Sequence, residues 1–227
     1  MSLRDYLFHA EPGITLYCGD CRDVLPLLEA DALVTDPPYG ISLGECGDPR
    51  GGSHGMRHDG YLGSDTFEDF RDHIVPRINL ALDMTRRGAV FTGPHIHEQR
   101  KPDAIGGVFC PAGQGRTSWG FKSFLPVLLY GGSPTVMRGK GATHPTTIRS
   151  SDTSEQNGHP VPKPIRWMTW LVSLASLEGE IVIDPFAGSG TTLLAAKETG
   201  RGAIGVEIEP RYCEIAVKRL RQEVLAL

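Results

Sequence analysis

The sequence predicts an α/β protein with a largely parallel sheet, because short apolar segments alternate with segments of helical periodicity. The 227 residues suit one domain with a substantial core, and we expect residues 1–227 to form a single domain. Two apolar segments, 32–35 and 181–184, lead directly into clusters of Pro, Gly and acidic residues. Each cluster is therefore expected at the carboxyl end of a strand.

Six strands are expected where short apolar runs end at turn-forming or acidic residues. They are 14–18, 32–35, 88–92, 125–130, 181–184 and 203–207. Apolar side chains at three- and four-residue steps predict a helix over 65–84, kinked at Pro76. Three further helices are expected to begin at Pro164, to run from Thr191 to Thr199 before Gly200, and to run from Pro210 towards Leu225.

Two segments have loop composition. Residues 40–64 are rich in Gly, Ser, Asp and His, which predicts a mobile loop. Residues 131–160 are rich in Gly, Thr, Ser and Pro and are also expected to be loop. Both flank the two strand-end clusters, and long loops in a compact domain are usually functional or disordered.

Composition excludes several classes of protein. The five cysteines lack the regular spacing of a disulfide framework, and the Cys18-x-x-Cys21 pair is not followed by a second pair, so we expect no metal. No apolar run approaches the roughly 18 residues of a membrane helix. The first residues lack the pattern of a secretory signal, so we expect a cytoplasmic protein.

Charge is unevenly distributed along the chain, although the formal net charge is only −4. Residues 1–85 carry six basic and fifteen acidic side chains, whereas residues 86–166 carry eleven basic and four acidic ones, a net charge of +7. Such segregation is expected of one face that meets phosphates, although a chance excess on a solvated surface would give the same counts.

The turn Gly188-Ser189-Gly190 joins a predicted strand to a predicted helix. Glycines let the backbone approach a ligand closely, and a helix N-terminus favours a carboxylate or phosphate. In nucleotide-binding α/β folds an acidic residue about 20 positions further on accepts hydrogen bonds from ribose hydroxyls. Glu207 has this position, and the alternative is an exposed charge at a strand end.

Asp36-Pro37-Pro38-Tyr39 and the segment from Asp184 to Thr192 together resemble the two signature motifs of S-adenosylmethionine-dependent DNA amino-methyltransferases. The resemblance implies a Rossmann-like class I methyltransferase fold with a mostly parallel, seven-stranded sheet, with S-adenosylmethionine as cofactor and DNA as partner. The catalytic motif precedes the cofactor turn, which is the permuted order of the family's β class. A bacterial or phage-encoded restriction–modification protein is therefore expected.

The resemblance implies that Asp36, Pro37, Pro38 and Tyr39 are the catalytic residues. The Asp36 side chain and the Pro37 carbonyl would accept the two N–H groups of an exocyclic amino group and aim its lone pair at the sulfonium methyl. Tyr39 offers a ring for stacking, and the base would have to be flipped out of the duplex. The prolines would stiffen the loop. The alternative is a simple Pro-Pro turn that closes the strand, but such a turn would not explain the acidic and aromatic residues beside the prolines.

Two shorter segments extend the resemblance: 16–21, where Asp20 would contact the adenine end of the cofactor, and 159–164, which would enter the cofactor pocket. In both, an ordinary turn is the alternative. The cofactor-binding residues that the resemblance implies are Asp20, Cys21, Asp36, Lys163, Asp184, Phe186, Gly188, Ser189, Gly190, Thr191, Thr192, Glu207 and Ile208.

The β class recognises its target between the two motifs, so we expect a short target-recognition region within 93–160, with Arg138 and Lys140 as phosphate contacts. The region is too short for an independent domain, which favours relaxed specificity or a homodimer. Asp in the first position of the tetrad favours adenine N6 over cytosine N4. The alternatives are an RNA or protein amide methyltransferase, and a catalytically silent nucleic-acid-binding subunit.

Overall fold

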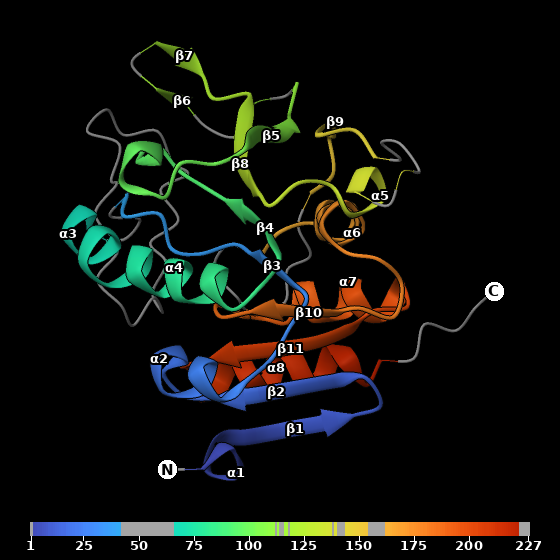
Figure 1. The fold of residues 1–227 in the computed structure, drawn as a ribbon. Coiled ribbons are helices and arrows are strands. Elements are labelled where there is room, and N and C mark those ends of the chain that lie inside the picture. Colours follow the sequence, from blue (N-terminus) through green and yellow to red (C-terminus); the bar gives the residue numbers. More distant parts are fainter. Residues whose placement is uncertain are drawn as a thin grey trace.

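A computed structural model describes residues 2–41, 66–111, 113, 116, 117, 119–137, 139, 144–153 and 162–222. In these residues nine strands form one sheet (Figure 1). Their spatial order is β1 (Leu7–Glu11), β2 (Ile14–Cys18), β11 (Gly202–Glu207), β10 (Ile181–Asp184), β3 (Ala32–Thr35), β4 (Arg87–Phe91), β8 (Phe124–Tyr130), β5 (Ala104–Phe109) and β9 (Thr147–Arg149). A separate hairpin consists of β6 (Arg116–Thr117) and β7 (Gly120–Phe121).

The predicted α/β architecture with a mostly parallel sheet is confirmed, and all six expected strands are present within one residue of their expected bounds. The expected number of seven strands is wrong, because β1 pairs with β2 as a hairpin and β9 adds to the opposite edge. Both are edge strands with partly exposed side chains, such as Leu7 at 48% exposure. Such strands lack the continuous apolar run that identifies a buried parallel strand.

Helices cover both faces of the sheet. In β3, Ala32 and Val34 pack into a core with α6 (Ile165–Ala175), α7 (Thr191–Glu198) and α8 (Pro210–Leu220). Leu33, which points to the other face, packs with α2 (Cys21–Val24) and α4 (Val75–Asp83). Successive side chains of a strand point to opposite faces of the sheet. Because helices cover both faces, the central strands are buried on both sides. The remaining helices are α1 (Leu3–Tyr6), η1 (Leu25–Leu27), α3 (Phe67–Asp69), η2 (Phe70–Ile74), η3 (Ile96–Glu98) and α5 (Pro134–Met137).

The helix expected over 65–84 is interrupted where Pro76 predicted a kink. The segment begins at α3, capped by the Thr66 hydroxyl, passes through the π-helical turn η2 and continues as α4. The Val75 N–H bonds the Phe70 carbonyl, five residues back. Proline lacks an N–H and its ring clashes with the carbonyl four residues earlier, so a widened turn just before Pro76 accommodates it.

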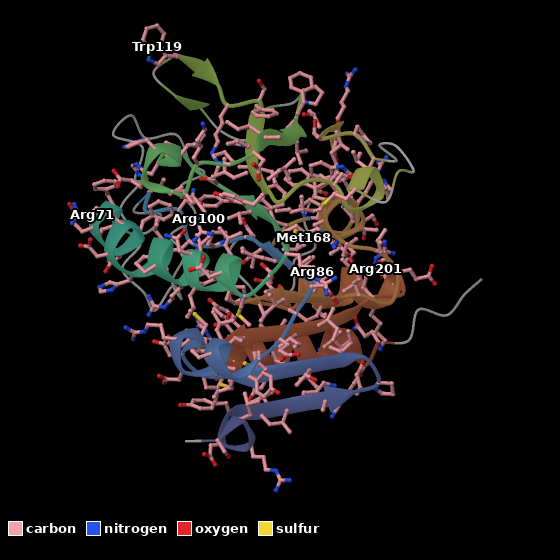
Figure 2. All side chains as sticks on the ribbon, viewed as in Figure 1. Arg71, Arg86, Arg100, Trp119, Met168 and Arg201 are labelled. Atoms are coloured by element: carbon pink, nitrogen blue, oxygen red, sulfur yellow. The ribbon has the colours of Figure 1, made fainter. Side chains whose placement is uncertain are left out.

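The loop prediction for 131–160 is wrong in part, because α5 and β9 lie within it. The last helix ends at Leu220 rather than running towards Leu225. Almost all of the loop expected at 40–64 lies outside the described residues, as do Arg138, Lys140 and the segment 159–161. No helix in the described parts of the chain is long and apolar enough to cross a membrane. The side chain of Trp119 projects from the β6–β7 hairpin (Figure 2).

Candidate active site

The topology brings the two strand-end motifs to one edge of the sheet. Strands β10 and β3 are parallel neighbours, with Ile183 paired to Leu33, so their carboxyl ends meet. From β10 the chain passes through α7 to β11 on one side, and from β3 it passes through α4 to β4 on the other. The point between β10 and β3 is therefore a topological switch point, where α/β sheets bind ligands.

Asp184 joins the two motifs. Its Oδ1 accepts the Thr35 hydroxyl at 2.6 Å and the Phe186 N–H at 3.0 Å, and its Oδ2 accepts the Thr192 hydroxyl. The carboxyl is only 2% exposed, and this burial raises its pKa to about 6. Its contacts link the strand before Asp36 to the helix after the glycine turn. Asp184, which is predicted among the cofactor residues, therefore holds the two motifs together through buried hydrogen bonds.

Asp36, Tyr39 and Lys163 form a contact group at the end of β3. The Tyr39 hydroxyl donates to Asp36 Oδ1, and Lys163 Nζ lies 2.7 Å from Asp36 Oδ2. The Lys163 ammonium also lies 5.3 Å from the centre of the Tyr39 ring. The Lys163 side chain is 10% exposed and that of Asp36 22%. Lys163, predicted as a cofactor residue, thus contacts the predicted catalytic carboxylate.

Glycines hold Tyr39 and its neighbours in place. A Cβ on Gly93, just after β4, would lie 2.8 Å from Tyr39 Cβ, so only glycine lets the two segments approach this closely. Gly40 has a φ of +69°, and a Cβ there would lie 2.6 Å from Phe70 Cβ. His95 Nε2 lies 3.2 Å from the Gly40 carbonyl oxygen. These contacts fix where the chain leaves the tetrad.

Glu207 lies against the glycine turn at the end of β11. Its Oε2 accepts the Gly188 N–H at 2.8 Å, and its Oε1 accepts the Glu209 N–H at 2.9 Å. The residue is 8% exposed, and burial raises its pKa. The next residue, Ile208, is 61% exposed at the same edge. An acidic group and an exposed apolar group therefore lie side by side at this strand end.

Gly190 begins α7 in the left-handed region, with a φ of +77°. A Cβ there would lie 2.8 Å from Ala216 Cβ on α8, so glycine is required both by its backbone conformation and by packing. Ser189, Thr191 and Thr192 are all buried. The turn is thus built into the core, with its backbone held against α8.

Arg219 is a site residue that sequence reasoning missed. Its Nη1 donates to the Ser189 carbonyl at 2.8 Å and to Thr191 Oγ1 at 2.9 Å, and the residue is 8% exposed. Arg219 lies three residues after Ala216, on the face of α8 that packs into the core. An arginine at a core-facing position of an amphipathic helix was the signal available in the sequence.

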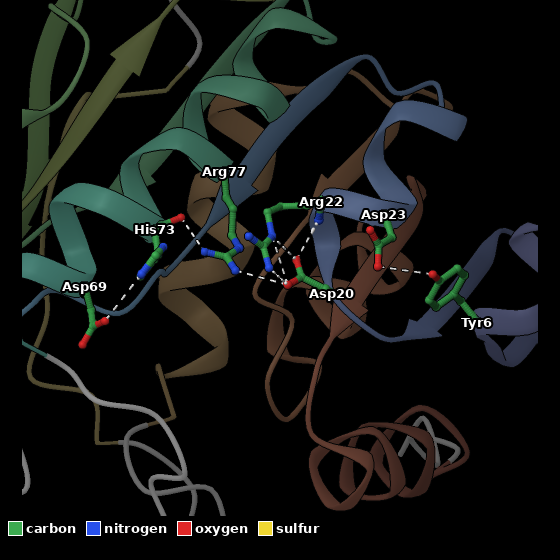
Figure 3. A network of polar contacts seen from close by, with 7 residues as sticks. All are labelled: Tyr6, Asp20, Arg22, Asp23, Asp69, His73 and Arg77. Carbon is green, nitrogen blue, oxygen red and sulfur yellow. Dashed lines mark hydrogen bonds and ion pairs between the residues drawn. The ribbon is translucent and has the colours of Figure 1, made fainter. Parts of the chain in front are cut away.

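Asp20 and Cys21 follow β2 at the start of α2, and the Asp20 side chain is already engaged by arginines (Figure 3). The Asp20 carboxylate caps α2 through the Arg22 N–H and forms ion pairs with Arg22 at 2.7 Å and Arg77 at 3.2 Å. Although burial acts the other way, these arginines hold the pKa of Asp20 well below its usual range. Cys21 is 5% exposed, and burial raises its pKa to about 12. The Cys21 thiol therefore lies in the core, and the predicted contact of Cys21 with the cofactor stays a prediction.

Lys122, between β7 and β8, interacts electrostatically with Lys163. Burial and the neighbouring Lys163 ammonium lower its pKa. In the described part of the chain, His, Cys, Asp and Glu side chains do not form a group of three or more that could hold a metal ion.

The sheet topology and the glycine turn at its switch point define the Rossmann-like class I methyltransferase fold. Two solved structures share it. The M1.HpyAVI–SAM complex superposes with a TM-score of 0.65 at 20% identity, covering 92% of this chain and 99% of that one. The PvuII DNA methyltransferase (cytosine-N4-specific) gives a TM-score of 0.64 at 15% identity, covering 94% and 88%. At these identities the likeness shows the fold alone.

Residues 99–218, just over half of the chain, match the family described as DNA methylase, and the chain belongs to this family. It is 49% identical over 78 residues to the type II methyltransferase M.HindIII of Haemophilus influenzae, covering 34% of this chain and 25% of that protein. It is 43% identical over 65 residues to M2.DpnII of Streptococcus pneumoniae, covering 29% and 24%. The matched segment spans about a quarter of these curated relatives.

Proposed function

We propose that this protein transfers a methyl group from S-adenosylmethionine to an exocyclic amino nitrogen of a base in DNA. The observation that carries the proposal is the group formed by Asp36, Tyr39 and Lys163, next to the glycine turn at the switch point. Family membership and the type II methyltransferase relatives support the same activity and the same cofactor. The structure of M1.HpyAVI was solved as its SAM complex.

The residues at this edge fit the proposed cofactor. The backbone of the glycine turn would face its methionine part, Glu207 would accept hydrogen bonds from its ribose, and the exposed Ile208 would contact its adenine. When bound, S-adenosylmethionine supplies an electrophilic methyl group on a sulfonium. Asp184 and Arg219 would act indirectly, by holding the turn in position.

The proposed catalytic step requires an acceptor for the target amino group. Tyr39 contacts Oδ1 of Asp36 and Lys163 contacts Oδ2, and each carboxylate oxygen can accept a further hydrogen bond, so an incoming amino group could bind while both partners hold Asp36 in place. The amino nitrogen then bonds the methyl carbon as the carbon–sulfur bond breaks. Asp36 stabilises the positive charge that develops on the nitrogen, which afterwards loses one proton.

Adenine N6 is our proposed target in preference to cytosine N4, because Asp occupies the first position of the tetrad. The base would be flipped out of the duplex to reach Asp36 at the sheet edge. Cytosine N4 is the alternative, since the fold is shared with a cytosine-N4-specific enzyme.

The test is mass spectrometry of nucleosides from unmethylated DNA and RNA incubated with the protein and S-adenosylmethionine. We expect N6-methyldeoxyadenosine from DNA. Asp36→Ala should lower the rate by about 10²–10³, the usual loss for one catalytic hydrogen-bond partner. Asp83→Ala removes an exposed carboxylate from α4 and serves as the control. Near-normal transfer by Asp36→Ala would reject the catalytic assignment, and methylated RNA alone would reject DNA as substrate.

A further inference from the structure

The β6–β7 hairpin extends from the same sheet edge as the catalytic motif. Strand β8 is antiparallel to β4, with Phe91 paired to Val127, so the first residue of β8, Phe124, lies beyond the carboxyl end of β4. The hairpin directly precedes β8 and projects away from the sheet (Figure 1). The chain therefore returns from the hairpin to the sheet beside Gly93 and Tyr39, which follow the neighbouring strands.

Trp119 connects the two short strands of the hairpin and is 98% exposed. Its ring points away from the body of the protein (Figure 2). Of the four exposed Phe, Tyr and Trp side chains in the described residues, three lie on this hairpin or at its base: Trp119, Phe109 and Phe124. Phe109 and Phe124 are paired across β5 and β8. Tryptophan is highly buried on average in folded proteins, so a tryptophan that is 98% exposed is unusual.

The hairpin returns to the sheet next to the catalytic group. Lys122 lies two residues before Phe124, beyond the carboxyl end of β4, and the Lys163 ammonium that contacts Asp36 contributes to its lowered pKa. Two residues separate Trp119 from Lys122, so in extended chain the two Cα atoms would lie about 10 Å apart, three steps of about 3.3 Å. This distance corresponds to about three base steps at 3.4 Å each. The hairpin thus extends, from the sheet edge that carries Asp36, over a length comparable to a flipped base and its neighbours in the stack.

A flipped base leaves unstacked neighbours in the duplex, and flipping costs a few kcal/mol. Proteins offset such costs by inserting apolar side chains between bases. Stacking of a base on an aromatic ring is worth about 1–3 kcal/mol and requires no particular sequence. A tryptophan side chain that is 98% exposed matches this chemistry, since its ring can meet a base face.

We propose that Trp119 enters the base stack of duplex DNA beside the flipped base and covers the face of the base that flipping exposes. This inference rests on the proposed function, because it takes the base bound at Asp36 as the methyl acceptor. It adds a residue that stabilises the flipped state without contacting the reacting atoms. Trp119 is thus a positioning residue, and its contribution should depend on whether the target base is paired.

Tryptophan fluorescence tests the contact without requiring catalysis. The other two tryptophans, Trp167 and Trp170, are 1% and 9% exposed, so acrylamide quenching reports mainly on Trp119. We expect short random-sequence duplex DNA to quench the wild-type emission and to protect it from acrylamide. Trp119→Phe should remove both signals. Unchanged quenching at saturating DNA would overturn the proposal.

Methyl transfer tests the role in flipping. Trp119→Ala should lower kcat/KM for duplex DNA by about 5- to 150-fold, the equivalent of one stacked base. The loss should largely disappear when the target base lies opposite an abasic site, where no pair must be broken. Trp119→Phe should keep most of the activity, and S-adenosylmethionine affinity should not change. Phe8→Ala, which removes an exposed aromatic ring from β1 at the opposite end of the sheet, is the control.

The outcomes separate this inference from the proposed function. Wild-type methylation of DNA with a fully active Trp119→Ala variant overturns the role of Trp119 and leaves the proposed function intact. An equal loss on paired and abasic duplexes also overturns it. DNA-dependent protection of Trp119 without methyl transfer supports the contact and rejects the proposed activity.

Discussion

At the scale of single residues, Lys163 contacts Asp36, the first residue of the proposed catalytic motif. The motif alone indicates a carboxylate and an aromatic ring, but not that a partly buried ammonium lies 2.7 Å from the carboxylate. The ammonium also lies 5.7 Å from the centre of the Phe91 ring. It is therefore surrounded by the Asp36 carboxylate and by the rings of Tyr39 and Phe91. Lys163 can therefore position Asp36 for the amino group.

We expect Lys163→Met to lower kcat by about tenfold, or about 1.4 kcal/mol of barrier, because Asp36 loses its partner. The KM for S-adenosylmethionine should stay near the wild-type value, and Lys163→Arg should restore part of kcat. Steady-state kinetics with both substrates varied makes the measurement, with the exposed Lys101→Met as control. A raised cofactor KM with unchanged kcat would instead support the cofactor-binding role that the sequence predicts.

At the scale of elements, the glycine turn depends on a neighbouring helix. Its backbone is held by Glu207 at the end of β11 and by Arg219 from α8. Gly190 lies so close to Ala216 that α7 and α8 meet at the turn itself. The position of the proposed cofactor site is therefore set by β11, α7 and α8. The glycine motif in the sequence indicates only the start of α7.

We expect Arg219→Met to weaken S-adenosylmethionine binding by about tenfold, because the buried Ser189 carbonyl and Thr191 hydroxyl lose a donor at a cost of about 1–3 kcal/mol. Isothermal titration at a temperature well below unfolding measures this. Arg87→Met is a matched control, since Arg87 is equally buried but pairs with Glu180 at the amino ends of the strands. Both variants should lose stability, and equal cofactor affinity in both would contradict the role of Arg219.

At the scale of the whole molecule, the sheet order converts charge segregation along the chain into segregation in space. Residues 86–166 supply β4, β8, β5 and β9, which are adjacent at one end of the sheet. The acidic first third supplies β1 and β2 at the other end (Figure 1). The basic end also carries the β6–β7 hairpin, so a duplex that reached Asp36 would lie against it.

DNA binding should weaken steeply with salt, with a logarithmic slope of about −0.9 per neutralised phosphate. Replacing Arg138 and Lys140 by Ala should lower affinity for all sequences similarly and flatten the slope by about two. Fluorescence anisotropy over a salt series measures both quantities. Lys218→Ala with Arg221→Ala removes two exposed cations, one on α8 and one at its C-cap, and should leave the slope unchanged. If the first pair also leaves it unchanged, these residues do not contact phosphate.

The sequence by itself determined the six core strands, the helices that follow the two motifs, and the residues at the sheet edge. These are local properties, because apolar periodicity and turn residues record them in short segments. Edge strands such as β9 were missed because half-exposed strands leave little apolar signal. The turn residues of 131–160 concealed α5 for a similar reason, since composition does not reveal a helix of four residues.

Only the tertiary structure decided what each site residue contacts. Asp184 and Cys21 stand in segments that resemble cofactor motifs, yet the fold buries both, and Asp20 is engaged by Arg77 from a distant helix. Arg219 reaches the glycine turn from 28 residues beyond Thr191. Such contacts join residues that are far apart in the chain, and their partners are set by sheet order and helix packing. A motif therefore locates the site, whereas packing decides which of its side chains remain available to a ligand.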